Sequence, residues 1–215
     1  MDETTSREKI LKKVRNALIS KLENPYQNTD FDSSVYKKMD ESLDITFAQE
    51  FTKASGKFIY CESFEEFLGN LGILIKENQW ESIFCREEDL FEQLQSANVP
   101  YKHTEEDFKK TLVGLSSCEA LIARLGSIMV SSRQSGGRRI NAYPEIHIVF
   151  AYTSQLVADI KDGIKTLQGK YNKKLPSMIT FITGPSRTAD IEKTLVMGAH
   201  GPKELYLFFI DDSIN

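Results

Sequence analysis

Residues 56–71 read GKFIYCESFEEFLGNL, and this stretch decides the fold. Residues 58–61 form a short apolar run that predicts a strand. Ser63 and Glu66 have the spacing of a capping box, which predicts that a helix begins here. The apolar residues of that helix share one face: Phe64, Phe67, Leu68 and Leu71. The stretch therefore predicts one strand–helix unit.

The same alternation continues along the rest of the chain. Further strands are expected at 83–85, 112–115, 127–130, 146–151, 178–182 and 205–210. A helix with Leu90, Phe91 and Leu94 on one side is expected after the second strand. A long helix capped by Ser154 and a short helix at 189–197 are expected later. Strands that alternate with helices predict an α/β fold with a mostly parallel sheet.

The N-terminal part has a different pattern. Ile10, Val14, Leu18 and Leu22 follow at four-residue steps among charged residues, which predicts an amphipathic helix within 1–24. Residues 25–55 are polar with isolated aromatic residues, so one or two short helices are expected to pack onto the main body. We therefore expect an N-terminal helical segment at 1–56 and a single domain at 57–215.

Composition limits the class of protein. A chain of 215 residues with 40% hydrophobic and 27% charged residues can bury a full core. Its net charge of -4 argues against nucleic-acid binding. No apolar run approaches the roughly 20 residues of a membrane-spanning helix, and the charged N-terminus does not resemble a secretory signal. Three scattered cysteines, Cys61, Cys85 and Cys118, suit a reducing compartment, so we expect a cytoplasmic protein with no membrane span.

The most informative candidate site lies between the strand at 178–182 and the short helix expected after it. Its residues are Gly184, Pro185, Ser186, Arg187, Thr188 and Asp190. Unpaired N–H groups in the first turn of a helix attract anions, and Arg187 would add a planar fork for a carboxylate or phosphate. The alternative is that the Ser, Thr and Asp residues only cap the helix and that Arg187 is a surface charge.

A second candidate follows at 198–202. Gly198 suits the end of the expected short helix, and Gly201 and Pro202 restrict the loop around His200. His200 could act as a general acid or base, or as a neutral hydrogen-bond donor. A histidine that bonds a loop carbonyl is the structural alternative. His103 and His147 have no ligand-spaced partners, so we predict no protein-bound metal.

A third candidate region spans 118–139. Gly126 and Ser127 open a strand, and Arg124, with Arg133, Arg138 and Arg139, gives this acidic protein a locally basic stretch suited to an anionic ligand or partner. The alternative is solvated arginines on a mobile hairpin. Glu119 is the best carboxylate candidate for catalysis here, although an exposed glutamate in the first turn of a helix is the commoner explanation.

These motifs together resemble the LUD-domain family, and within it the lactate-utilisation protein C type. The resemblance rests on GPSRTADIE at 184–192, G-x-HGP at 198–202 and A-x-x-G-[ST]-I-x-V at 123–130, and it covers about 57–210. One departure concerns Arg124, because many family members have an acidic residue at this position. An altered ligand is expected if that acidic residue contacts ligand elsewhere in the family.

The resemblance implies a fold like that of the NagB/RpiA/CoA-transferase group. It also implies a role in oxidising L-lactate to pyruvate, with partner proteins that carry iron–sulfur clusters. Larger members append a cysteine-rich segment that this sequence lacks, so this chain is expected to bind no cluster and no other cofactor itself. The favoured hypothesis is an accessory subunit of a lactate-oxidising complex that binds a small anion or a partner through a pocket at Arg187 and His200.

Two other functions stay open. The first is a stand-alone enzyme that acts on a phosphorylated or carboxylate substrate, as the sugar-phosphate isomerases and CoA transferases of this fold group do. Against it, the sequence has no G-x-x-x-x-G-K phosphate loop and no clear pairing of a nucleophile with a base. The second is a structural assembly factor, which would bind no ligand.

Overall fold

The computed structural model describes residues 5–19, 26, 30, 36, 38–189 and 195–213. Contacts divide the chain into two compact units, Met1–Lys38 and Met39–Asn215. The first contains helix α1 (Ser6–Ile19), in which no side chain is buried, and this confirms the expected N-terminal helix. Leu22 lies outside the described residues. No described helix is both long and apolar enough to cross a membrane.

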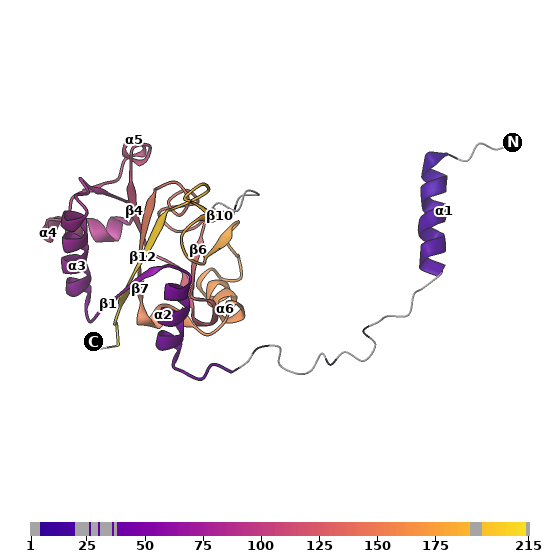
Figure 1. Ribbon diagram of the computed structural model, residues 1–215, viewed down its shortest axis with the longest axis horizontal. Coiled ribbons are helices and arrows are strands. Elements are labelled where there is room, and N and C mark those ends of the chain that lie inside the picture. The colour runs from indigo at the N-terminus through magenta and orange to yellow at the C-terminus, as the bar shows by residue number, and fades with distance from the viewer. Residues whose placement is uncertain are drawn as a thin grey trace. The chain divides into compact units, whose positions relative to one another are not determined.

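The second unit is built on a six-stranded sheet in which every neighbouring pair of strands is parallel (Figure 1). This confirms the expected α/β fold with a mostly parallel sheet. In spatial order the strands are β1 (Lys57–Cys61), β12 (Glu204–Ile210), β7 (Ile146–Tyr152), β4 (Val113–Ser116), β2 (Ile83–Cys85) and β3 (Tyr101–Lys102).

Helices α3 (Phe64–Glu77) and α4 (Phe91–Ser96) cover one face of this sheet. Ser63 caps α3 as expected, because its side chain accepts a hydrogen bond from the Glu66 N–H. The Glu66 carboxylate accepts from the Glu62 N–H at 2.6 Å, one residue earlier than a standard capping box. The apolar face of α3 packs on the strand side chains that point towards this helix, including Phe150 and Phe208.

A second, four-stranded sheet packs on the other face together with helix α2 (Leu43–Lys53). Its strands, in spatial order, are β8 (Leu156–Val157), β5 (Ala120–Ile122), β6 (Ser127–Ser131) and β9 (Ile179–Ile182). Helix α6 (Ile160–Lys170) covers the outer side of this sheet. The layers therefore run helix, sheet, sheet, helix.

Helix α2 belongs to the large unit. Phe47 and Phe51 are completely buried between the two sheets and stack on each other with ring centroids 5.5 Å apart. The sequence analysis ended the N-terminal segment at 56 and expected short helices within 25–55 to pack onto the main body, as α2 does. The contacts divide the chain after Lys38.

The long helix begins later than expected. Thr153–Gln155 form a single 3-10 turn, and Ser154 donates its backbone N–H and its hydroxyl to Asp212. Leu156 and Val157 form β8, which pairs with β5. Helix α6 starts only at Ile160, where the Asp159 side chain accepts the first N–H. The expected cap at Ser154 was wrong because this hydroxyl already has a partner in the C-terminal segment.

Candidate functional site

The segment after β9 forms a hairpin. Strands β10 (Arg187–Ala189) and β11 (Leu195–Met197) pair in antiparallel register, with Thr188 opposite Val196, and Gly198 N–H donates to the Ser186 carbonyl at 3.0 Å. The helix expected at 189–197 was therefore wrong in its described residues. The anion site argued from a helix N-terminus loses that support. Asp190 lies outside the described residues.

The structure does bring the two C-terminal motifs together. The Ser186 N–H donates to the Pro202 carbonyl at 2.8 Å, and the His200 N–H donates to the Ser186 hydroxyl at 3.4 Å. Gly201 packs closely on Ser186, since a Cβ on this glycine would lie 3.4 Å from the serine Cβ. His200 is exposed and Pro185 is buried. Ser186 is thus the junction between the motifs.

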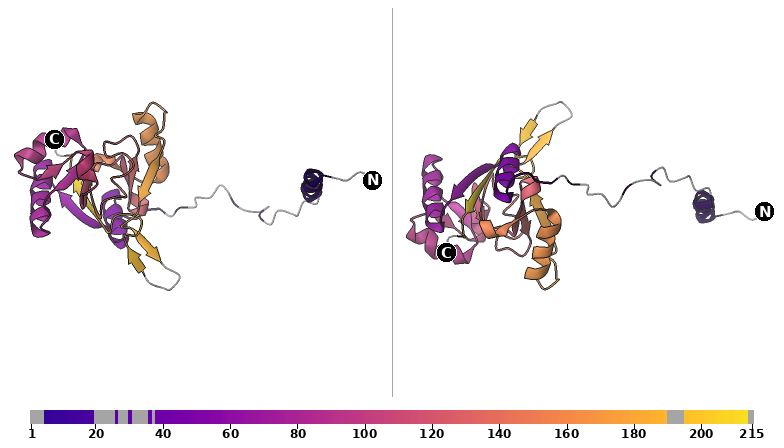
Figure 2. Two further views of the ribbon diagram at one scale, coloured as in Figure 1. Left: turned by 90° about the horizontal axis from the view of Figure 1, so that it is seen from above. Right: turned by 90° about the horizontal axis from the view of Figure 1, so that it is seen from below.

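The hairpin is attached to the C-terminal end of α2. Gly184 has φ +83°, and a Cβ there would lie 2.2 Å from the Ala54 carbonyl oxygen. The Arg187 guanidinium donates to the same carbonyl. Ser127 and Thr183 share a hydroxyl–hydroxyl bond of 2.6 Å beside it. Figure 2 shows β10 and β11 leaving the body of the domain from this attachment point.

The attachment lies at the amino ends of the parallel strands. Pro202 lies two residues before β12, and the Lys203 N–H donates to the Glu145 carbonyl just before β7. Ligands of open α/β sheets bind at the opposite, carboxyl ends of the strands. The contacts made by Gly184, Ser186 and Arg187 thus hold the hairpin on the domain.

Gly126, Arg124 and Glu119 also make structural contacts. Gly126 has φ +57°, and a Cβ there would lie 2.2 Å from the Phe51 nitrogen. The Arg124 Nε donates to Asp159, the residue that caps α6, at 2.9 Å. Glu119 is buried immediately before β5, which corrects the interpretation that it is exposed in a helix.

Glu119 accepts three hydrogen bonds. They come from the Ser131 hydroxyl at 2.5 Å, the Lys170 ammonium at 2.8 Å and the Tyr171 hydroxyl at 2.8 Å. Burial alone would raise the pKa of this carboxyl, but the three donors together hold its pKa below the ordinary value. The carboxylate is therefore ionised at neutral pH and ties α6 to the β5–β6 hairpin.

A different part of the domain has the geometry of a ligand site. From β2 the chain continues outward to β3, whereas from β4 it turns back towards β7. The strands β2 and β4 are neighbours, and their connections leave in opposite directions. This arrangement defines a topological switch point. Such a point leaves a crevice at the carboxyl ends of the strands.

A crevice of about 440 Å³ lies at the carboxyl ends of β2 and β3. The residues that line it are Arg86, Glu88, Asp89, Phe91, His103 and Ser135. The Arg86 Nη2 donates to Glu105 at 2.7 Å, and the His103 ring lies against the Phe91 ring with centroids 5.1 Å apart. The crevice thus combines a guanidinium, an imidazole, a hydroxyl and two carboxylates.

The basic stretch identified in the sequence forms a loop beside this crevice. Ser135 lines the crevice directly, and Arg139 bonds Glu105, the same carboxylate that pairs with Arg86. Gln134 anchors the loop, because its side chain accepts from the Ser131 N–H at 2.8 Å and donates to the Ser117 hydroxyl at 3.2 Å. The loop is therefore tied to β4 and β6 next to the crevice.

Arg86 and His103 were missed by the sequence analysis. Arg86 directly follows an expected strand, so its position after an apolar run was a usable signal. His103 gave no such signal, because β3 has only two residues and follows Pro100. Only the folded sheet brings the two side chains into one crevice.

Comparison with known proteins places the chain in a family. The LUD domain model matches residues 46–210. The chain belongs to the LUD domain family. Lactate utilization protein C of Shouchella clausii is 36% identical over 103 residues, which cover 46% of this chain and 44% of that protein. Lactate utilization protein C of Halalkalibacterium halodurans is 31% identical over 119 residues, 52% of each chain. The matched part of this LUD chain thus spans about half the length of these curated relatives or less.

The LUD fold is also found in a solved structure. A DUF162 family protein from Deinococcus radiodurans superposes with a TM-score of 0.59 at 16% identity, over 78% of this chain and 96% of that chain. This similarity confirms the fold of the LUD domain.

Proposed function

We propose that this LUD-domain chain acts in lactate utilisation as an accessory subunit, and that it binds the small 2-hydroxy or 2-keto carboxylate in the crevice at the carboxyl ends of β2 and β3. The role is supported by the relatives, which are named lactate utilization protein C. The position of the ligand is supported by one observation: Arg86 and His103 line the same polar crevice at the carboxyl ends of β2 and β3.

The chemistry of this pair suits a hydroxy acid. A guanidinium carries five N–H donors, and the bond from Arg86 to Glu105 uses Nη2. A ligand carboxylate would bind the guanidinium through charge-assisted hydrogen bonds. The imidazole of His103 would accept a hydrogen bond from a 2-hydroxyl group or donate one to a 2-keto oxygen. Ser135 provides a third polar contact from the loop.

The proposal includes partner proteins. Conversion of L-lactate to pyruvate removes two electrons and two protons, and the family resemblance assigns the electrons to subunits that carry iron–sulfur clusters. The role of this chain would be to bind and orient the acid. That it binds no cofactor itself stays a prediction.

The decisive experiment compares L-lactate with propionate, which differs only by lacking the 2-hydroxyl group. We expect calorimetry to show tighter binding of L-lactate, and Arg86→Ala to weaken it by about tenfold to a hundredfold, equivalent to roughly 1.5 to 3 kcal/mol. His103→Ala should remove the preference for L-lactate over propionate. Arg138→Ala is the matched control, because Arg138 bonds Ser177 and does not line the crevice.

The same titrations test the hairpin as the alternative site. If Arg187→Ala weakens L-lactate binding while Arg86→Ala leaves it unchanged, the ligand binds beside the hairpin, as the sequence analysis expected. If wild-type protein binds neither L-lactate nor pyruvate at about 10 mM, the proposed ligand is wrong and an assembly role is favoured.

A further inference from the structure

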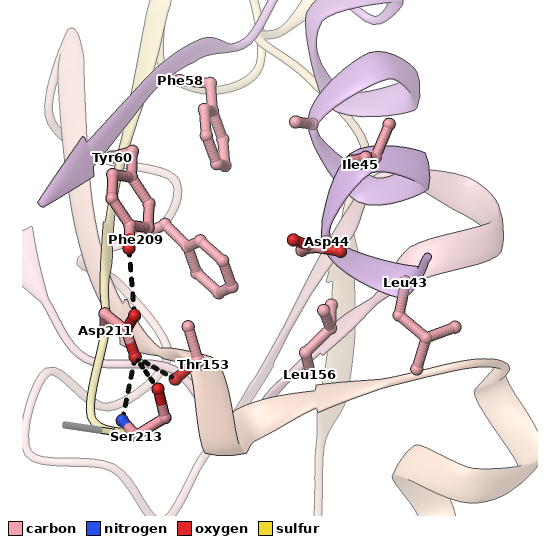
Figure 3. Close-up of a pocket in the computed structure, with 11 residues that line it drawn as sticks. Leu43, Asp44, Ile45, Phe58, Tyr60, Thr153, Leu156, Phe209, Asp211 and Ser213 are labelled. Carbon is pink, nitrogen blue, oxygen red and sulfur yellow. Dashed lines mark hydrogen bonds between the residues drawn. The ribbon is translucent and has the colours of Figure 1, made fainter. Parts of the chain in front are cut away.

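A second cavity lies beside β1, at the opposite edge of the large sheet from β3. It has a volume of about 480 Å³, is open to solvent, and is lined by the first turns of α2, by β1, by β8 and by the end of β12 (Figure 3). It shares no lining residue with the crevice at the carboxyl ends of β2 and β3. Its size is within the range of small-molecule sites in proteins.

The walls of this cavity are mostly apolar. They are formed by Leu43, Ile45, Ala48, Phe58, Leu156 and Phe209. The Phe58 and Phe209 rings lie 5.7 Å apart, tilted by 45°, and Tyr60 adds a third aromatic ring. A ligand with an apolar body could therefore displace water from these surfaces and gain hydrophobic stabilisation.

One carboxylate of the cavity is held in a fixed orientation. Asp211 follows β12, and its Oδ2 accepts from the Tyr60 hydroxyl at 3.0 Å. Its Oδ1 accepts from the Ser213 N–H at 2.8 Å and from the Ser213 hydroxyl at 2.6 Å. The Ser213 bonds and then the Tyr60 bond hold the pKa of Asp211 below its ordinary value. Asp211 is thus a preorganised negative charge.

A second carboxylate faces the cavity from the opposite side. Asp44 belongs to the first turn of α2, and Figure 3 shows its carboxylate on the α2 side while Asp211 lies on the β12 side. A hydrogen bond from Ser42 lowers the pKa of Asp44. Among the described residues that line the cavity, none is Lys, Arg or His. The cavity therefore carries two negative charges that no lining cation neutralises.

We propose that this cavity binds an organic cation, namely an amine or quaternary ammonium group carried on an apolar, preferably aromatic, body. The apolar body would pack on Phe58 and Phe209, whose ring faces also attract a positive charge. The cationic group would lie between Asp44 and Asp211. This site is separate from the proposed lactate crevice, which has a guanidinium at Arg86, and its two carboxylates without a lining cation disfavour a carboxylate ligand.

The experiment uses 2-phenylethylamine as the probe, with 3-phenylpropionate and 2-phenylethanol as anionic and neutral analogues of similar shape. Calorimetry and thermal-shift measurements on the full chain should show binding of the amine and at least tenfold weaker binding of both analogues. Asp211→Asn and Asp44→Asn should each weaken amine binding by about tenfold. Asp162→Asn is the control, since Asp162 lies on α6, pairs with Lys165 and does not line the cavity.

The melting temperature of each variant shows whether the variant is folded, so that a loss of binding is assigned to the charge. The proposal is overturned if 3-phenylpropionate binds as well as the amine, if both Asp variants bind the amine like wild type, or if wild type binds no amine at about 10 mM. Because lactate binding is measured with other ligands and at other residues, failure of either proposal leaves the other standing.

Discussion

The Lys170 ammonium donates a 2.8 Å hydrogen bond to Glu119, whose side chain has no exposed surface, while the lysine side chain stays 54% exposed. The pair connects the last turn of α6 to the start of β5. Ser131 and Tyr171 complete the set of donors to the carboxylate. All of these partners are side chains of this domain, so the Glu119 carboxylate joins α6 to the β5–β6 hairpin.

Replacing Glu119 by Gln should therefore destabilise the fold. The amide removes the negative charge and presents one oxygen to three donors, so we expect a loss of about 2 to 3 kcal/mol in the free energy of unfolding. Urea denaturation measures this loss. Glu92→Gln, at an exposed position of α4, is the matched control and should change stability by less than about 0.5 kcal/mol.

The pH dependence of this contribution has a defined sign. The folded-state pKa of Glu119 is lowered, so its stabilisation is complete above the unfolded-state pKa and is lost as the pH falls through the folded-state value. Wild type and Glu119→Gln should converge in stability at acidic pH. A stability difference that stays constant down to the lowest pH at which the protein is folded would contradict this account.

Alanine substitutions at three glycines with positive φ allow the cost of backbone strain to be compared with the cost of a steric clash. A Cβ at Gly126 would clash with the Phe51 backbone, and a Cβ at Gly184 would clash with the Ala54 carbonyl. A Cβ at Gly137 would have no other heavy atom within 4 Å. Gly137→Ala should thus lower the free energy of unfolding only by the strain of the left-handed conformation, about 1 to 2 kcal/mol. Gly126→Ala and Gly184→Ala should cost about 1 to 3 kcal/mol more. Thermal unfolding of the three variants checks this order, and equal losses would mean that the contacts at α2 can relax.

His147 should make the protein sensitive to mild acid. It is completely buried on β7, its Nε2 is 2.9 Å from the Ser116 hydroxyl, and burial lowers its pKa to about 4. A lowered histidine pKa means that stability is complete above the unfolded-state value of about 6.5 and is lost as the pH falls towards 4.

This loss should reach up to roughly 3 kcal/mol in wild type and be absent in His147→Gln, which can still bond Ser116. The measurement is the free energy of unfolding of both proteins between pH 7 and about pH 4. If the free energies of unfolding of the two proteins change in parallel with pH, protonation of His147 does not destabilise the fold.

Most strands could be predicted because each is a short apolar run between polar or turn residues. The runs at 58–61, 83–85 and 205–210 became β1, β2 and β12 with boundaries shifted by at most one residue. Their order in the sheet could not be predicted. Pairing of Lys57 with Tyr206 joins residues far apart in the sequence, and no local pattern records it.

The candidate site was only partly predictable. The motifs at 184–188 and 198–202 do meet, through Ser186, but the helix expected between them is a hairpin in its described residues. A three-residue run such as Leu195–Met197 fits both helical and strand periodicity, so the pattern alone could not decide. The crevice at Arg86 and His103 depends on β2 and β3 being neighbours, and this is known only once the strand order is known.

The position of β12 between β1 and β7 has a consequence for how the protein is made. During synthesis, β1 emerges from the ribosome long before the strand that must pair with it. Until residues 204–210 are available, β1 and β7 both present open edges, and unpaired strand edges promote aggregation. The domain therefore cannot complete its sheet until residues 204–210 have been synthesised, and a nascent chain that stalls before this strand is the form most in need of a chaperone.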